Sequence, residues 1–173
     1  LSLKIKEIRE ATDWQIPIQL KLGAARVYDD VRMAAKCEPD SIFIDGMEGG
    51  TGAGPHIATE ETGVPGIAAI RQARNALDDV GKSGEISLVY AGGIRNGGDV
   101  AKALALGADA VAIGHSSLMA LNCNRDIDEA DFPNEIGVEA GSCYHCHTGR
   151  CPVGVATQDP KLRARLNPDE ASE

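Results

Sequence analysis

The sequence has few aromatic residues, which make up 3% of its 173 positions, and it has no long apolar run. A helix that crosses a bilayer needs about 20 consecutive apolar residues, and no secretory signal is visible either. Basic residues are outnumbered: 17 Lys and Arg stand against 26 Asp and Glu, and the formal net charge is -9. Nucleic-acid binding calls for a basic face. We therefore expect a cytoplasmic protein that binds neither membranes nor nucleic acid.

The apolar residues that are present are mainly aliphatic. Hydrophobic residues make up 43% of the chain, and 20 positions are glycine. This composition suits one globular domain with a buried core, and it is typical of aliphatic parallel strands joined by glycine turns. The chain begins at Leu1 rather than Met, which predicts a fragment or a processed piece of a longer protein.

Helix and strand patterns alternate along most of the chain. Helices are predicted at residues 3–12, 27–38, 67–80, 99–106 and 116–121, and strands at 18–22, 41–45, 86–90 and 110–113. This order is that of a parallel sheet with right-handed crossovers. A complete barrel needs eight strands and about 250 residues. The predicted fold class is therefore α/β, with parallel β/α units that form the second half of a (β/α)8 TIM barrel.

Three regions follow from this pattern. Residues 1–122 are expected to form the half-barrel, and residues 123–158 an acidic insertion followed by a cysteine-rich segment. Residues 159–173 are expected to form a charged tail that consists of a helix and a frayed end.

Two glycine sites fall at the carboxyl ends of consecutive predicted strands. Gly92 and Gly93 follow the first of these strands, and Gly114 and His115 follow the second. In a β/α barrel this face carries the chemistry, and the loops after strands 7 and 8 often bind a phosphate. Glycine lets backbone N–H groups approach an anion closely. A single site would indicate only a tight turn, but two sites one β/α unit apart favour a phosphate-binding role.

Two further features point to the same end of the sheet. Lys21 alternates with Leu20 and Leu22, so it faces away from the helices, and a ligand-facing role is favoured over a solvated strand end. Residues 46–55 contain five glycines in ten positions and follow a predicted strand. Such a loop is expected either to hold a phosphate or substrate or to act as a mobile lid.

The five cysteines are distributed unevenly. Cys37 lies in a predicted helix, where a free cysteine is expected to be a small core residue. The other four are Cys123, Cys143, Cys146 and Cys151. An odd total without a secretory signal favours metal or redox chemistry over a disulfide scaffold.

The spacing of the last three cysteines allows their thiolates to converge on one inorganic centre. Cys143 and Cys146 are separated by two residues, Cys146 and Cys151 by four, and Pro152 follows, as is common beside iron–sulfur ligands. His145 and His147 keep structural zinc as a competitor, because mixed Cys/His ligation is common for that metal. The residues alone do not separate an iron–sulfur cluster from zinc.

Several motifs closely resemble those of the FMN-binding glutamate synthase family. The family's signature is matched by Cys146-His147, four residues further by Cys151-Pro152, and by the run that continues to residue 160. Residues 45–52 and 97–101 resemble its other blocks, and the resemblance extends over residues 16–166. It implies an FMN-containing barrel that reduces 2-iminoglutarate, made from 2-oxoglutarate and ammonia, to glutamate. It also implies an iron–sulfur cluster that relays electrons to the flavin, with 3Fe-4S favoured over 4Fe-4S.

The resemblance also assigns roles to residues. Lys21 would lie beside the flavin ring as a catalytic cation. The phosphate would be bound by Gly92, Gly93, Gly114 and His115, and the flavin and substrate would be bordered by Gly49, Gly50 and Thr51. Where the family usually has a glutamine and a lysine, this chain has Gly93 and Arg95, and Arg95 is suited to pair with a carboxylate or phosphate.

The cluster ligands stay open, because 22 residues separate Cys123 from Cys146. The set is Cys123, Cys146 and Cys151, or Cys143, Cys146 and Cys151, or all four. The implied partners are an amidotransferase domain or subunit and an electron-donating flavoprotein or ferredoxin, in an oligomeric assembly. An N-methylglutamate synthase-like subunit and a non-catalytic iron–sulfur electron-transfer module are the alternatives. The fragment alone is expected to be inactive.

Overall fold

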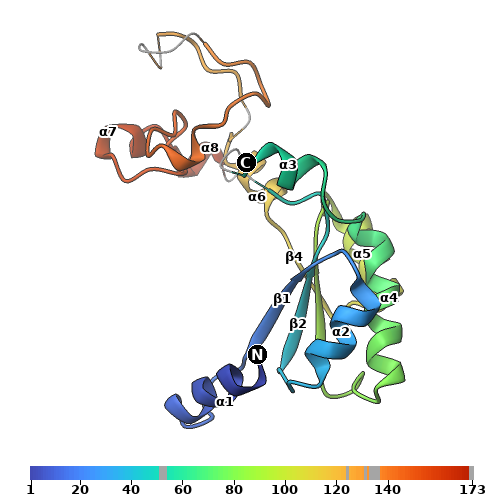
Figure 1. Cartoon of the computed structure of the whole chain (residues 1–173). Helices are drawn as coiled ribbons and strands as arrows, with labels where there is room; N and C mark the ends of the chain where they lie inside the picture. The colour runs from blue at the N-terminus through green and yellow to red at the C-terminus, as the bar shows by residue number, and fades with distance from the viewer. Residues whose placement is uncertain (51–53, 124, 131, 133–136, 172–173) are drawn as a thin grey trace. The chain divides into compact units, whose positions relative to one another are not determined.

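The computed structural model describes residues 1–50, 54–123, 125–130, 132 and 137–171 (Figure 1). Helices and strands alternate as far as α6. The elements in chain order are α1 (Ser2–Ala11), β1 (Gln19–Gly23), α2 (Val27–Ala35), β2 (Ser41–Asp45), α3 (His56–Glu60), α4 (Gly66–Asp79), β3 (Ser87–Ala91), α5 (Gly97–Leu106), β4 (Ala110–Ala112), α6 (His115–Ala120), the 3-10 turn η1 (His145–His147), α7 (Pro160–Arg163) and α8 (Pro168–Ala171). Two compact units are formed, one by residues 1–49 and 59–113 and the other by residues 50–58 and 114–173. This division falls after residue 113, whereas the sequence placed a boundary after residue 122.

The first unit is built on a four-stranded parallel sheet with the order β1-β2-β3-β4. The register pairs Leu20 with Ile42 and Ile42 with Leu88, so aliphatic side chains of three strands lie on one face. Helices α2, α4 and α5 lie on one side of the sheet and pack their apolar residues against this face (Figure 1). The predicted parallel α/β arrangement is confirmed.

The core of this unit lies between the sheet and these helices. Ile42 and Leu88 of the sheet and Val31 and Leu77 of the helices are completely buried. Burying one such aliphatic side chain contributes about 1.5–3 kcal/mol. The core therefore fixes the carboxyl ends of the strands, where the candidate residues lie.

The opposite face of the sheet carries mainly polar and small side chains, together with Phe43 and Val89, and all of them are exposed or half-buried. Lys21 of β1 lies on this face and pairs in register with Phe43 of β2, and Gly23 pairs with Asp45. Gln19 donates a hydrogen bond to Ser41 across the same two strands at 3.0 Å. The alternation read from the sequence therefore placed Lys21 on the correct face.

A largely buried arginine ties α4 to the loop before β4. Arg74, whose side chain is 12% exposed, donates to the carbonyl of Gly107 at 2.8 and 2.6 Å and pairs with Asp109 at 2.7 Å. Asp109 also accepts a hydrogen bond from the backbone N–H of Leu88 at 2.7 Å. Gly107 ends α5 in the left-handed region with φ of 115°, a conformation that glycine often supplies at the end of a helix.

The second unit has a small apolar cluster of its own. Its buried members are Ile127, Phe132, Cys151 and Val153. A short antiparallel bridge joins Ile127 to Val138, with both N–H···O distances at 2.9 Å. Among the described residues of the whole chain, no helix is long and apolar enough to span a membrane.

Three local expectations were wrong. The helix predicted at 27–38 ends at Ala35, because Pro39 disfavours a helical backbone at Glu38, which has a positive φ of 52°. Cys37 lies beyond this end and is half-buried rather than a core residue. In the helix predicted at 99–106, the apolar spacing places Val100, Ala103 and Leu104 on the inner face, but Leu104 is 45% exposed, while Ala103 is buried.

Candidate functional site

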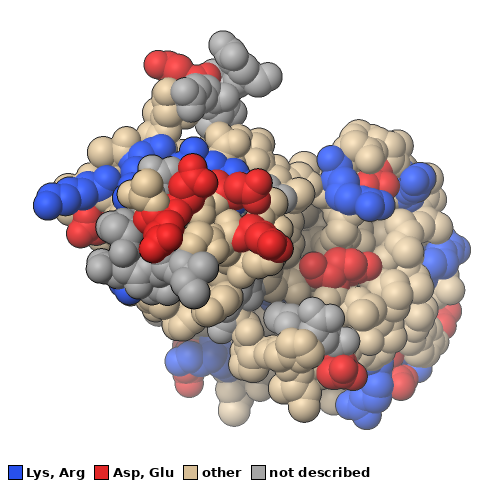
Figure 2. All heavy atoms as spheres, turned by 90° about the horizontal axis from the view of Figure 1, so that it is seen from above, with Lys and Arg blue, Asp and Glu red and all other residues tan. Residues whose placement is uncertain are grey.

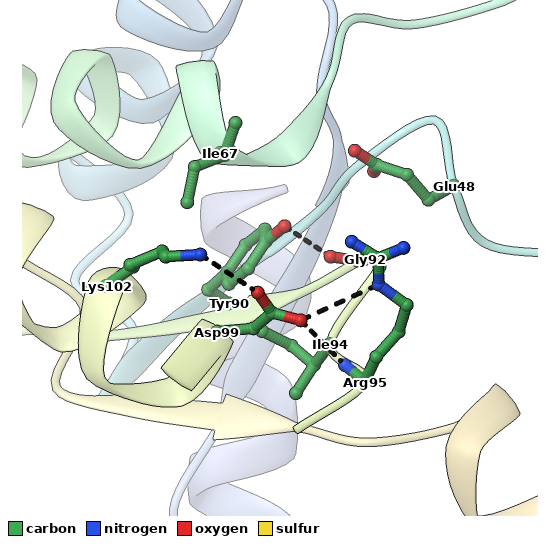
Figure 3. Close-up of a pocket in the computed structure, with 9 residues that line it drawn as sticks. Glu48, Ile67, Tyr90, Gly92, Ile94, Arg95, Asp99 and Lys102 are labelled. Atoms are coloured by element: carbon green, nitrogen blue, oxygen red, sulfur yellow. Dashed lines mark hydrogen bonds and ion pairs between the residues drawn. The ribbon is translucent and has the colours of Figure 1, made fainter. Parts of the chain in front are cut away.

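A cavity of about 440 Å³ opens at the carboxyl end of β3 and the start of α5 (Figure 3). It lies within the first unit. Its lining residues are Glu48, Ile67, Tyr90, Gly92, Gly93, Ile94, Arg95, Asp99 and Lys102. The cavity thus brings together three of the predicted cofactor residues: Gly92, Gly93 and Arg95. They lie at the carboxyl end of β3, as the sequence predicted.

The turn after β3 requires glycine. Gly92 and Gly93 have φ of 127° and 67°, which side chains rarely allow. The hydroxyl of Tyr90 donates a hydrogen bond to the carbonyl of Gly92 and so fixes the turn from below (Figure 3). Burial raises the pKa of Tyr90 to about 12, with the charges of Glu48 and Asp99 as further causes. The phenol therefore stays neutral and remains a donor.

Glu48 occupies the space that these glycines leave. Its carboxylate accepts hydrogen bonds from the backbone N–H of Gly66, at the start of α4, at 3.0 and 3.2 Å. A Cβ added to Gly92 would lie only 2.7 Å from the Glu48 carboxylate, and a Cβ on Gly66 would lie 2.5 Å from the ring of Tyr90. Gly92 and Gly66 therefore leave room for the Glu48 carboxylate at the N-terminus of α4, where the helix dipole favours a negative charge.

Charged groups surround the first turn of α5. Asp99 accepts from the backbone N–H of Arg95 at 3.2 Å and pairs with Lys102 at 3.4 Å. The hydrogen bond from Arg95 and the Lys102 ammonium hold the pKa of the Asp99 carboxyl below its usual value, despite partial burial. The Arg95 and Lys102 side chains are 81% and 70% exposed. Their cationic ends are therefore accessible to an anion in the cavity.

Lys21 forms an ion pair on the polar face of the sheet. Its ammonium lies 2.7 Å from the carboxylate of Asp45 and 5.0 Å from the centre of the Phe43 ring. A Cβ added to Gly49 would lie 3.1 Å from the same Asp45 carboxylate, so the glycine-rich loop starts beside this pair. Two predicted residues, Lys21 and Gly49, are thus linked through Asp45.

The remaining predicted cofactor residues stay predictions. Gly114 and His115 belong to the second unit, where they begin α6 and are both exposed. Gly50 has a φ of 140°, and Thr51 lies outside the described residues.

The four clustered cysteines all lie in the second unit. Burial raises the pKa of the Cys123 thiol, and the neighbouring thiols of Cys146, Cys151 and Cys143 raise it further. The insertion therefore does not separate Cys123 from the other three in space. Across the described part of the chain, no three His, Cys, Asp or Glu side chains form a ligand group for a single metal ion.

Sequence reasoning missed the acidic groups of the site. Asp45 and Glu48 occur in the stretch DGMEGG, in which roles were predicted only for glycines. A carboxylate at the carboxyl end of a parallel strand was the available signal for Asp45. The hydrogen bond between Glu48 and the backbone of Gly66 joins positions 18 residues apart, so it could not be predicted from the sequence.

Charged side chains of both signs are present on the surface of the molecule. On the face that Figure 2 shows, Lys and Arg side chains alternate in small groups with Asp and Glu among the described residues.

Comparison with known sequences gives consistent matches. A sequence model of the conserved region in glutamate synthase matches residues 1–128 and 134–173. The glutamate synthase large subunit-like protein of Rhizobium meliloti (strain 1021) is 48% identical over 168 residues, 97% of this chain and 38% of that protein. The archaeal glutamate synthase (NADPH) of Methanocaldococcus jannaschii is 36% identical over 170 residues, 98% of this chain and 30% of that protein. The chain thus spans less than two fifths of the length of these relatives.

Solved structures share the α/β fold. A flavocytochrome b2 variant with pyruvate bound has a TM-score of 0.53 and 25% identity, over 71% of this chain and 28% of its own. A mandelate oxidase variant with a monooxide FMN adduct has a TM-score of 0.50 and 30% identity, over 70% of this chain and 33% of its own.

Proposed function

This chain belongs to the glutamate synthase family, and from that premise we propose that it is part of an FMN- and iron–sulfur-dependent oxidoreductase that makes glutamate. Its sheet would supply four strands of a (β/α)8 barrel whose other strands come from elsewhere in the protein. The substrate would be 2-iminoglutarate, formed from 2-oxoglutarate and ammonia. The oxidoreductase class is supported by the glutamate synthase relatives and by the flavin adduct in the mandelate oxidase neighbour.

The observation that carries this proposal is the Gly92–Gly93 turn, which opens on the cavity beside Arg95. The FMN phosphate would be held by the backbone amides of this turn and by the Arg95 guanidinium. The Glu48 carboxylate is hydrogen-bonded to the Gly66 N–H at the start of α4 and keeps its negative charge, so a phosphate would not lie beside it. The phosphate would instead lie toward α5, where a Cβ added to Gly97 meets nothing within 4 Å.

Lys21 would place its positive charge beside the flavin ring, and Gly49, Gly50 and Thr51 would border ring and substrate. Bound FMN supplies hydride chemistry. The chain's own contribution is position and charge: Asp45 holds the Lys21 ammonium at 2.7 Å on the polar face of the sheet. Reduction of the imine then needs two electrons and two protons for each glutamate formed, and the electrons would come from a partner flavoprotein or ferredoxin. An amidotransferase domain or subunit would supply the ammonia.

The second unit would hold the iron–sulfur cluster. The proposal is supported by the chemistry of the donors, because four of the five cysteines lie in this unit and three of them lie within nine residues of sequence. Thiolates are the usual ligands of iron–sulfur clusters. Cys123, Cys146 and Cys151 or Cys143, Cys146 and Cys151 would hold a 3Fe-4S cluster, and all four a 4Fe-4S cluster. Zinc is the competing occupant.

The test is the cofactor content of the protein isolated anaerobically from its host. We expect FMN, together with iron and acid-labile sulfide in near-equal amounts. Cys151→Ala should lose iron and sulfide, whereas the matched control Cys37→Ala, in the other unit, should keep both. Zinc without iron and sulfide would contradict the cluster. A cluster without flavin would contradict the enzyme and favour an electron-transfer module, and activity with methylamine instead of ammonia would favour an N-methylglutamate synthase.

A further inference from the structure

His145 is buried among aromatic rings in the turn between two of the candidate thiol ligands. Its side chain belongs to a residue that is 9% exposed, and its ring is stacked on Tyr144 at a centroid distance of 5.4 Å. The ring of Phe132 contacts the imidazole edge-on, with the two ring centroids 5.1 Å apart and an interplanar angle of 68°. The Nδ1 atom of this imidazole has no hydrogen-bond partner among the described residues. Buried polar atoms in native proteins are nearly always paired.

The surroundings of His145 belong to the cysteine-rich segment. A cavity of about 460 Å³ is lined by Gly137, Val138, Glu139, Ser142, Cys143, Tyr144 and His145. Phe132, which packs on the imidazole, also belongs to the apolar cluster that buries Cys151 and contacts Cys143. Phe132 therefore joins the His145 ring to the apolar cluster that includes two of the four thiols.

We propose that His145 is a positioning residue for the iron–sulfur cluster, to which its Nδ1–H donates a hydrogen bond at a sulfur atom. This inference rests on the proposed function, which supplies the cluster. Outer hydrogen bonds of this kind orient metal ligands and tune the metal centre. Hydrogen bonds to the sulfur atoms are among the factors that set the reduction potential of iron–sulfur clusters.

The direction of the effect follows from charge. Reduction adds one electron to the cluster, and an N–H donor stabilises the more negative state. In apolar surroundings this stabilisation is stronger than in water. His145 should therefore raise the reduction potential of the cluster. His147 follows Cys146 in the same turn but is exposed, so water is available to its nitrogens and it should have little effect.

The experiment measures the midpoint potential of the cluster by an EPR-monitored redox titration of the anaerobically isolated protein. His145→Phe keeps the ring and its packing but removes both nitrogens. We expect its potential to fall by an amount equal to about a tenfold change in the reduction equilibrium, or about 59 mV for one electron. His145→Asn carries its amide near the position of Nδ1 and should keep most of the wild-type potential. His147→Phe is the matched control and should leave the potential unchanged.

The outcomes separate this inference from the proposed function. If the wild-type protein contains no iron and sulfide, the cluster and the inference both fall. If the cluster is present and His145→Phe has the wild-type potential, the inference alone is overturned. If His145→Phe loses its cluster, His145→Gln, whose amide reaches the Nε2 position instead, is compared with His145→Asn. If the Asn variant alone has the wild-type potential, the role of Nδ1 is supported. If the Asn and Gln variants have equal potentials, that role is overturned.

Discussion

The two oxygens of the Glu48 carboxylate share the hydrogen bond that the backbone N–H of Gly66 donates, at 3.0 and 3.2 Å. This contact fastens the loop after β2 to the first turn of α4, which has no side-chain cap of its own at Pro65. The same carboxylate lies against the turn after β3, at Gly92. Three segments that border the cavity are therefore held together by one side chain.

Replacing Gly92 should disturb this arrangement. Gly92→Ala introduces a Cβ 2.7 Å from the carboxylate at a residue with φ of 127°, and we expect a loss of about 1–3 kcal/mol in the free energy of unfolding. Gly97→Ala is the control, since its Cβ meets nothing within 4 Å, and it should change stability by no more than about 0.5 kcal/mol. Urea denaturation measures both. Equal stabilities would show that the Glu48 seat does not constrain the turn.

The phenol of Tyr90 should govern stability at alkaline pH. Its folded-state pKa is raised from 10.0 to about 12, mainly by burial. A raised pKa favours the protonated form in the folded state, so the contribution is complete below pH 10 and is lost as the pH rises toward 12. Tyr90→Phe should cost about 1 kcal/mol at neutral pH through loss of the bond to Gly92. It should also flatten the decline between pH 10 and 12. Parallel declines in the two proteins would contradict this assignment.

Asp40 should make the corresponding contribution at acidic pH. It accepts from the backbone N–H of Ile18 at 2.6 Å and pairs with Arg9 at 3.0 Å, and these contacts lower the pKa of its carboxyl from 3.8. Its stabilisation is therefore present above about pH 4 and is lost as the pH falls through the lowered value.

We expect Asp40→Asn to lower stability by about 1 kcal/mol at neutral pH, a modest value because the group is partly exposed. The variant should also show a weaker dependence on pH below 4 in acid-denaturation curves. Glu7→Gln is the control, since its ion pair with Lys4 is well exposed. A Glu7 variant as sensitive as the Asp40 variant would rule out the specific role.

Replacing Arg74 with lysine should destabilise the fold although the positive charge is kept. A lysine cannot reproduce the fork that binds Gly107 and Asp109 together, so Arg74→Lys should lower the free energy of unfolding by about 2 kcal/mol. Arg71→Lys, one helical turn earlier and exposed, should have almost no effect. Thermal unfolding of the two variants decides the matter, and indistinguishable midpoints would show that the arginine fork is dispensable.

Lys21 should be needed for activity rather than for folding. If its ammonium lies beside the flavin, Lys21→Met should lower kcat by roughly 100-fold, as for other removed electrostatic groups. FMN should remain bound, because the phosphate contacts are elsewhere. Lys4→Met, on an exposed part of α1, serves as the control. An unchanged kcat would remove Lys21 from the site.

Much of the fold could be predicted because its pattern is local. The strand at 41–45 was predicted with its observed bounds, and the alternation of β1 and the glycine stop of α5 follow from neighbouring residues. Cys37 was misplaced because the helix ended early, at a point set by the following proline. Leu104 was misplaced because several apolar residues of α5 compete for one face, and packing against the sheet decides among them.

The candidate site was predictable only where a residue acts through its backbone. Gly92 and Gly93 predict a turn from the sequence, whereas the position of the Glu48 carboxylate depends on a hydrogen bond with Gly66, from a different β/α unit. The ion pair of Lys21 with Asp45 depends on strand register. The proximity of Cys123 to the other thiols depends on the path of the insertion. Contacts between distant segments carry no local signature, so they had to come from the structure.

The order of the sheet has a second consequence. β1 and β4 stand at the two ends of the strand order, and a strand edge without a neighbour offers hydrogen-bonding groups to any extended chain. In the proposed barrel both edges would pair with strands from elsewhere in the protein. Residues 1–173 prepared alone should therefore self-associate more than the whole protein does, and light scattering at several protein concentrations would compare the two.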